Sequence, residues 1–157
     1  MSGIHIRVID EENLYRRIPN FRDNIWWEDG KIRLSSSAFN DRYKKPSVNR
    51  KALLPNPSET QENPSDGVVF LIAVAIRSIA GMVSKNDRGK VVETNKMDVV
   101  SDPIINHPEL PDNPAHALIV SDPDGIGGES FKRLKEALAF LVLRENWLIP
   151  SQEELQD

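Results

Sequence analysis

The chain has 157 residues, 39% of them hydrophobic and 28% charged, which is typical of a globular protein large enough to form its own core. It contains no cysteine, which excludes disulfide frameworks, thiolate metal sites and cysteine nucleophiles and suits a reducing cytoplasm. The formal net charge of −4 is unevenly divided, with eleven Lys/Arg against seven Asp/Glu in residues 1–51 and nine against seventeen in residues 52–157.

The first third of the chain is predicted to form short strands. Residues 4–9 are rich in β-branched side chains and predict a first strand, and residues 14–18 predict a second strand or a single helical turn. Residues 21–30 predict a loop that closes into a hairpin turn, and residues 31–34 alternate between polar and apolar as a half-exposed strand does. Residues 40–51 form a polar, basic stretch.

The middle of the chain combines a proline-rich loop with an apolar run. Three prolines among polar residues predict a flexible loop near 55–66. The run 68–76 has the length of a central strand that leads into a short helix at 77–82. No membrane span is predicted, because Arg77 interrupts an apolar stretch already shorter than the roughly 20 residues that a span needs. The first residues also lack the apolar core of a signal peptide.

The last third ends in the most regular pattern of the chain. Residues 84–97 predict a β-turn between edge strands, and residues 99–114, with four prolines, predict an irregular loop. Residues 117–120 predict a buried strand. Residues 129–146 predict an amphipathic helix, because apolar side chains recur at i, i+3 and i+4. The acidic tail 151–157 is expected to fray.

Together these elements predict an α+β fold, in which a mixed or antiparallel sheet carries the C-terminal amphipathic helix on one face. Residues 1–150 are expected to form a single domain of this kind, with a flexible loop near 55–66 and a disordered tail at 151–157.

A candidate anion-binding pocket starts from Arg16 and Arg17. Guanidinium groups suit phosphate or carboxylate, and the hydroxyls of Ser36 and Ser37 could bind the same anion, with Phe39 close behind them. The alternative is a pair of solvated arginines, which is common on protein surfaces.

His116 is the second candidate. It lies between an Asn113-Pro114 turn and the predicted strand 117–120, where the backbone is rigid and the side chain can still meet a ligand. A neutral imidazole there could orient a ligand or act as an acid or base. The alternative is a partly buried histidine that bonds to the nearby loop, since no complete catalytic motif accompanies it.

No cofactor and no metal ion are expected. His107 and His116, combined with the nearby acidic residues, do not match a recognised ligand spacing. The glycine-rich stretch 125–128 precedes a helix, but acidic residues flank it and would repel phosphate.

Aromatic residues of the basic third point to a macromolecular partner. One of two adjacent tryptophans on a strand must face away from the core, so Trp26 or Trp27 is expected to be an exposed protein-binding residue, together with Tyr43. The same side chains could stack on nucleic acid bases. The acidic chain, with a pI near 5.4, disfavours a general nucleic-acid binder.

Several short blocks of the chain resemble a family of short, uncharacterised bacterial proteins. The blocks are Tyr15-Arg-Arg-Ile18, Ser36-Ser-Ala-Phe39, Ser47-Val48, Gly67-Val68-Val69 and Asn113-Pro-Ala-His-Ala-Leu-Ile119. The resemblance carries no established activity, but it implies that Arg17, Ser37, Phe39 and His116 lie together in space. The stretches 56–66 and 84–99 are longer than the usual spacing of that family, which leaves open the loops around a shared pocket.

The function that these residues favour is that of a cytoplasmic bacterial accessory protein. It would bind a protein partner, encoded nearby, or an anionic small molecule through a pocket of the six residues Arg16, Arg17, Ser36, Ser37, Phe39 and His116.

Two alternatives stay open. One is an enzyme acting on a phosphate-bearing or nucleotide substrate, in which Arg17 anchors the phosphate, Ser37 orients it and His116 is the acid or base. The other is a nucleic-acid-binding accessory factor. The pocket readings require three distant segments to converge on one cleft.

Overall fold

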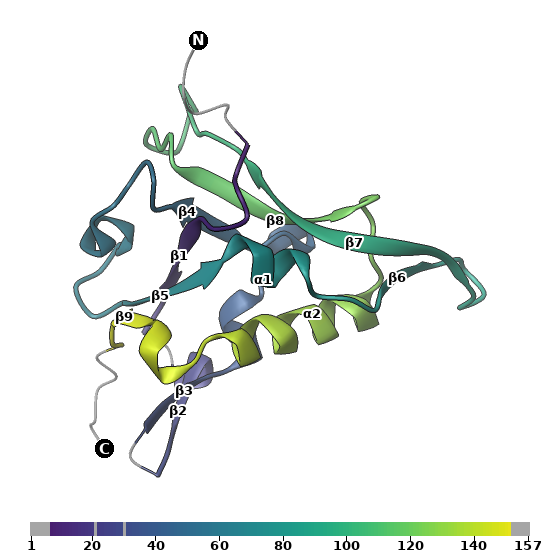
Figure 1. Cartoon of the computed structure of the whole chain (residues 1–157), viewed down its shortest axis with the longest axis horizontal. Coiled ribbons are helices and arrows are strands. Elements are labelled where there is room, and N and C mark those ends of the chain that lie inside the picture. The colour runs from purple at the N-terminus through teal and green to yellow at the C-terminus, as the bar shows by residue number, and fades with distance from the viewer. Residues whose placement is uncertain (1–6, 21, 30, 152–157) are drawn as a thin grey trace.

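The computed structural model describes residues 7–20, 22–29 and 31–151. An antiparallel sheet dominates the molecule, with strands in the order β6-β7-β8-β4-β1-β5-β9 (Figure 1). Its strands are β1 (Asn13–Ile18), β4 (Ser47–Arg50), β5 (Gly67–Ile72), β6 (Met82–Lys85), β7 (Val91–Ser101), β8 (His116–Asp122) and β9 (Trp147–Ile149). The remaining strands, β2 (Ile25–Glu28) and β3 (Lys31–Leu34), form a separate hairpin.

Two α-helices and several single turns complete the described fold. The helices are α1 (Ala73–Arg77) and α2 (Gly128–Leu141), and the 3-10 turns are η2 (Arg22–Asn24), η3 (Ser36–Phe39), η4 (Arg42–Lys44), η5 (Pro57–Thr60) and η6 (Arg144–Asn146). The α+β prediction is confirmed, with an antiparallel sheet and the C-terminal helix packed on one face of it. No helix in the described part of the chain combines the length and the apolar character that crossing a membrane requires.

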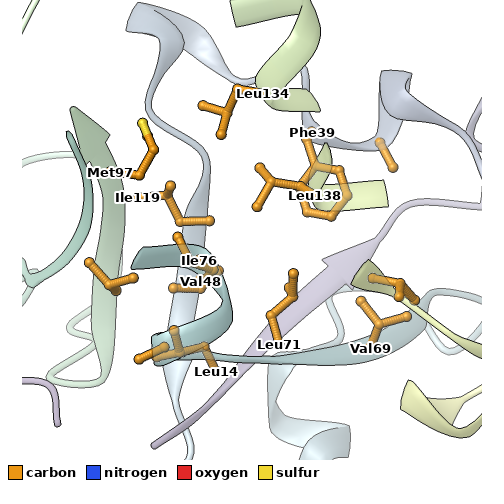
Figure 2. Packing of buried hydrophobic residues seen from close by; sticks show 14 of the residues in the cluster. Leu14, Phe39, Val48, Val69, Leu71, Ile76, Met97, Ile119, Leu134 and Leu138 are labelled. Atoms are coloured by element: carbon orange, nitrogen blue, oxygen red, sulfur yellow. The ribbon is translucent and has the colours of Figure 1, made fainter. Parts of the chain in front are cut away.

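The core lies between α2 and one face of the sheet. Successive side chains of a strand point to opposite faces, so Leu14 and Ile18 of β1 enter the core, whereas Tyr15 and Arg17 point to the other face. Figure 2 shows Leu134 and Leu138 of α2 together with sheet residues and with Phe39 of η3. We call the face away from α2 the outer face.

The C-terminal helix ends earlier than predicted. The periodic pattern reached residue 146, but α2 ends at Leu141, and residues 147–149 instead form the edge strand β9 beside β5. Asn146 Nδ2 donates a hydrogen bond to the carbonyl oxygen of Phe70 at 2.9 Å, which helps to hold this segment against β5. Tertiary pairing therefore overrides the local helical pattern.

Other predicted elements also need correction. Residues 7–9 of the predicted first strand are not in a strand, and residues 4–6 lie outside the described residues. The run 68–76 was predicted as a strand leading into a helix at 77–82, but β5 ends at Ile72, α1 spans Ala73–Arg77, and Met82 already begins β6. Strand β4 arises inside the stretch 40–51, where no strand was predicted.

Two segments that were expected to lack order have defined contacts. The loop 55–66 contains η5, and buried Asp66 accepts hydrogen bonds from the backbone N–H groups of Glu62 and Asn63. Ser151, the first residue of the predicted tail, is buried and its hydroxyl bonds to Asn20. The rest of that tail, 152–157, lies outside the described residues.

Candidate functional site

A cleft of about 550 Å³ opens where β1 and β4 separate. β1 pairs with β5 along all six of its residues, but its pairing with β4 extends over two pairs, Leu14 with Arg50 and Tyr15 with Asn49. A continued ladder would pair Arg16 with Val48 and Arg17 with Ser47. Since the strands part instead, residues from both faces of the sheet line the cleft.

The ion pair between Arg16 and Asp41 replaces the backbone hydrogen bonds that β1 and β4 would otherwise form at Ser47. The Arg16 guanidinium donates to both carboxylate oxygens of Asp41 at 2.7 Å, and its Nη1 also donates to the carbonyl oxygen of Ser47 at 2.8 Å. Asp41 Oδ2 in turn accepts from the backbone N–H of Ser47 at 2.7 Å. Both backbone groups of Ser47 that face β1 are thus satisfied, so Arg16 and Asp41 hold the cleft open.

The contact with Arg16 lowers the pKa of the Asp41 carboxyl. Burial by itself would raise the pKa, but the hydrogen bond and charge of Arg16, together with the Ser47 N–H, outweigh burial and lower it. Arg16 is buried and its charge is compensated, so it is not available to an incoming anion.

Arg17 differs from its neighbour because it points to the outer face. Its Nη1 lies 3.2 Å from Oδ2 of the buried Asp66, which anchors one edge of the guanidinium. Its Nε lies 3.5 Å from Glu62 Oε2, and the Glu62 side chain is 72% exposed. An exposed pair of this kind contributes little free energy, so a ligand anion could replace Glu62 beside Arg17.

Side chains of the three neighbouring strands β1, β4 and β8 lie in a row on the outer face, and the row ends at His116, which lines the cleft. Tyr15 of β1 lies opposite Asn49 of β4, and Asn49 lies opposite His116 of β8. His116 Nδ1 is 2.9 Å from the carbonyl oxygen of Asp102 and 3.2 Å from its Oδ2. A carbonyl oxygen can only accept, so Nδ1 carries a proton, and in the neutral imidazole Nε2 is then the acceptor.

Amide groups join the strands to the two loops beside the cleft. Asn113 Nδ2 donates to Asn49 Oδ1 at 2.8 Å, and Asn49 Nδ2 donates to Thr60 Oγ1 at 3.2 Å. Tyr15 adds a bond from its hydroxyl to the carbonyl oxygen of Pro55, and burial raises the pKa of this phenol. The polar groups of the lining are therefore preorganised, and they lie beside apolar residues such as Ile104 and Leu110.

The structure brings four of the six predicted pocket residues to this cleft. Arg16, Arg17, Ser37 and His116 line it. Ser36 lies on another concave surface, and Phe39 is fully buried in the core, with its ring centroid 5.3 Å from the carbon of the Arg16 guanidinium. The turn η3 separates these residues, because it places Ser36 and Ser37 on different surfaces and Phe39 in the core.

The hydroxyl of Ser37 is already engaged. It donates to the carbonyl oxygen of Asp23 at 2.6 Å and lies 3.2 Å from Asn24 Oδ1. Ser37 can accept a hydrogen bond from a ligand but is held by its own loop.

The aromatic residues predicted to contact a partner lie elsewhere. Trp26 is 48% exposed and lies beside the C-terminal end of α2, and the Trp27 side chain is outside the described part of the structure. Tyr43 is 85% exposed, with the positive φ of 61°, beside Lys44 and Lys45.

Several cations of the basic third contact the acidic remainder of the chain. Besides Arg17, Lys45 pairs with Asp124 at 3.4 Å, and Lys44 donates to the carbonyl oxygen of Ile126 at 3.0 Å. The charge asymmetry along the chain is therefore partly balanced by ion pairs within the fold. Among the described residues, no group of three or more His, Asp or Glu side chains is placed to hold a metal ion.

Three important residues of the cleft were not predicted: Asp41, Asn49 and Glu62. Asn49 belongs to β4, whose residues alternate between half-buried and buried positions in the structure. The sequence does not show this alternation, because the second buried position is Arg50, whose charge is paired with buried Glu12. Asp41 and Glu62 belong to irregular segments, where no periodicity marks a facing side chain.

No protein-family model, curated protein or solved structure matches the chain. The resemblance drawn from short blocks stays a prediction, and function has to be argued from the cleft itself.

Proposed function

We propose that this chain is a binding protein whose cleft takes a small polar ligand with one anionic group, a carboxylate or a phosphate. The observation that supports the proposal is the shared lining by Arg17 and His116, which come from β1 and β8 and are about a hundred residues apart in the chain. The proposal includes an accessory role in the bacterial cytoplasm, a reducing compartment that a cysteine-free chain suits.

The charges of the cleft favour a single anionic group over a polyanion. Its lining contains two arginines and two carboxylates, and Arg16 is neutralised by Asp41. Arg17 also lines the cleft, and one edge of its guanidinium is accessible to a ligand. Buried Asp66 binds Nη1 at 3.2 Å, whereas Glu62, 3.5 Å from Nε, is exposed and can be displaced. An anion on Arg17 would form charge-assisted hydrogen bonds with a guanidinium that is already oriented.

The remainder of the ligand would meet neutral polar groups. His116 Nε2 offers an acceptor, and the amides of Asn40 and Asn49 belong to the same lining. A ligand that carries hydroxyl or amide groups next to its anion would match this set, and a purely apolar one would leave these groups unpaired.

A thermal-shift screen of the full chain tests the proposal, with sugar phosphates, nucleotides, amino acids and small carboxylates as probes. A ligand at a hundred times its Kd stabilises the native state by about 2.7 kcal/mol. For a chain of this size that raises Tm by roughly 5–10 °C. Arg17→Gln should weaken the binding of any hit at least about tenfold, because a hydrogen bond to a charged group is lost.

The matched control is Arg33→Gln. Arg33 is also a partly exposed arginine beside a carboxylate, Glu28, but it lies outside the cleft. Binding that survives Arg17→Gln unchanged, or a screen in which no anion raises Tm, would refute the proposal.

A catalytic role is the second candidate, and the contact between His116 and Asp102 supports it. The protonated Nδ1 faces Asp102, so Nε2 could accept a proton from a substrate bound in the cleft. Assays with phosphoester and ester substrates would show activity that falls about a hundredfold or more in His116→Gln. Activity that is independent of His116 would exclude this candidate.

A further inference from the structure

A second concave surface of about 470 Å³ lies away from the cleft, between the β2–β3 hairpin and the C-terminal end of α2. Figure 1 shows this hairpin below the end of α2. Buried Leu34 and Val142 line its floor, and Trp26, Phe140 and Leu143 line its walls with exposed fractions of 48%, 82% and 51%. We call this surface the hairpin groove.

The core does not account for these exposed side chains. α2 buries Phe131, Leu134 and Leu138 against the sheet, and Phe140 lies off that apolar stripe. Single exposed apolar residues are ordinary, but an adjoining set with a tryptophan, a buried floor and a polar rim is typical of a protein-binding site.

The rim charges indicate what the occupant carries. Glu28 is paired with Arg33 at 3.1 Å, whereas Glu136 has no hydrogen-bond or ion-pair partner within the described residues. A carboxylate beside apolar walls is best complemented by a Lys or Arg next to apolar anchors.

We propose that the hairpin groove binds a segment of a partner protein that carries one or two large apolar side chains and a basic residue facing Glu136. The groove volume of about 470 Å³ would hold a drug-sized group, which is the size of one or two large side chains of a short segment. A second copy of this chain is the alternative occupant, and the oligomeric state of the wild type and of Phe140→Ala distinguishes it from a partner segment.

Selection from a random library of twelve-residue peptides against the full chain tests the proposal. Selected peptides should combine large apolar residues with Lys or Arg. Phe140→Ala should weaken their binding at least about tenfold, as the loss of an aromatic anchor does. Glu136→Gln should remove the preference for a lysine-bearing peptide over the same peptide with Lys replaced by Gln.

Tyr43→Ala is the matched control, since Tyr43 is as exposed as Phe140 but lies outside the groove. It should leave binding within twofold of the wild type. Leu143→Gln provides the same readout if Phe140→Ala does not fold.

Three results would overturn the proposal. One is that no peptide is enriched. The second is that selected peptides lack basic residues or bind Phe140→Ala as well as the wild type. The third is a dimer in sedimentation analysis that Phe140→Ala dissociates, which would show that a second copy occupies the groove. Loss of small-anion binding in Arg17→Gln concerns the cleft alone and leaves this proposal untouched.

Discussion

At the scale of single residues, two adjacent arginines have opposite environments because they lie on opposite faces of one strand. Arg16 is buried and supports the backbone of Ser47 together with Asp41, whereas Arg17 reaches the outer face beside an exposed glutamate. The same type of side chain is therefore a structural element at one position and a candidate ligand contact at the next.

Arg16→Gln is expected to lower the free energy of unfolding by about 3 kcal/mol, because removing one partner leaves the other charge and a backbone carbonyl uncompensated. Urea denaturation measures the loss. Arg33→Gln removes an exposed pair with Glu28 and should cost less than about 1 kcal/mol. Equal losses in the two variants would contradict the structural role of Arg16.

The lowered pKa of Asp41 predicts a pH dependence of stability. A carboxyl whose pKa is lower in the folded state than in the unfolded state stabilises the protein above its unfolded pKa, near 3.8. That contribution is lost as the pH falls through the lower, folded value.

Denaturation at pH 6 and at pH 2.5 should therefore show Asp41→Asn well below the wild type at pH 6. The difference between the two proteins should narrow at pH 2.5, because the carboxyl of the unfolded wild type is protonated there and part of the contribution of Asp41 is lost. A gap of constant size across this range would show that Asp41 does not titrate as its contacts require.

At the scale of elements, pairing with β5 makes the C-terminal residues 147–149 a strand. β9 lies close against the start of β5, where a Cβ on Gly67 would come within 2.6 Å of the Trp147 ring and 3.0 Å of the Ser151 backbone nitrogen. Gly67 thus allows the edge strand to approach.

Gly67→Ala is expected to destabilise the protein by about 1–3 kcal/mol, because the rigid indole and the backbone of β9 must move. Thermal unfolding measures the effect. Gly128→Ala is the control, since a Cβ there meets no atom within 4 Å and the residue begins α2. It should be neutral or slightly stabilising, and a similar loss in both variants would argue against the close contact.

At the scale of the whole molecule, the cleft exists because segments distant in the chain meet at the centre of the sheet. β1 lies between β4 and β5, and β8, about a hundred residues after β1, lies next to β4. The loops that flank the cleft come from two further regions, around residues 60 and 110.

Such non-local pairing predicts slow folding. The central strands must close long loops before their contacts form, so refolding in water is expected in milliseconds to seconds. Stopped-flow dilution from urea, followed by tryptophan fluorescence, measures the rate. Complete refolding within microseconds would indicate that local contacts dominate the transition state.

Much of the element content could be predicted from local patterns, and some of the site could too. The i, i+3, i+4 spacing identified α2 through Leu138, and the turn at Asn113-Pro114 placed His116 at the entry of β8. Strand β4 was missed because Arg50 occupies a buried position, where an unpaired charge would be too costly. Glu12, thirty-eight residues earlier in the chain, pairs with Arg50 and neutralises its buried charge.

By itself the sequence determined the α+β class, the amphipathic helix and the residue types that gather at the cleft, because periodicity and turn chemistry act over a few neighbouring residues. The tertiary structure alone decided that Arg16 is buried while Arg17 is accessible, that Phe39 belongs to the core, and that residues 147–149 form a strand. These outcomes depend on partners such as Asp41, Asp66 and β5, which only the folded chain brings into contact.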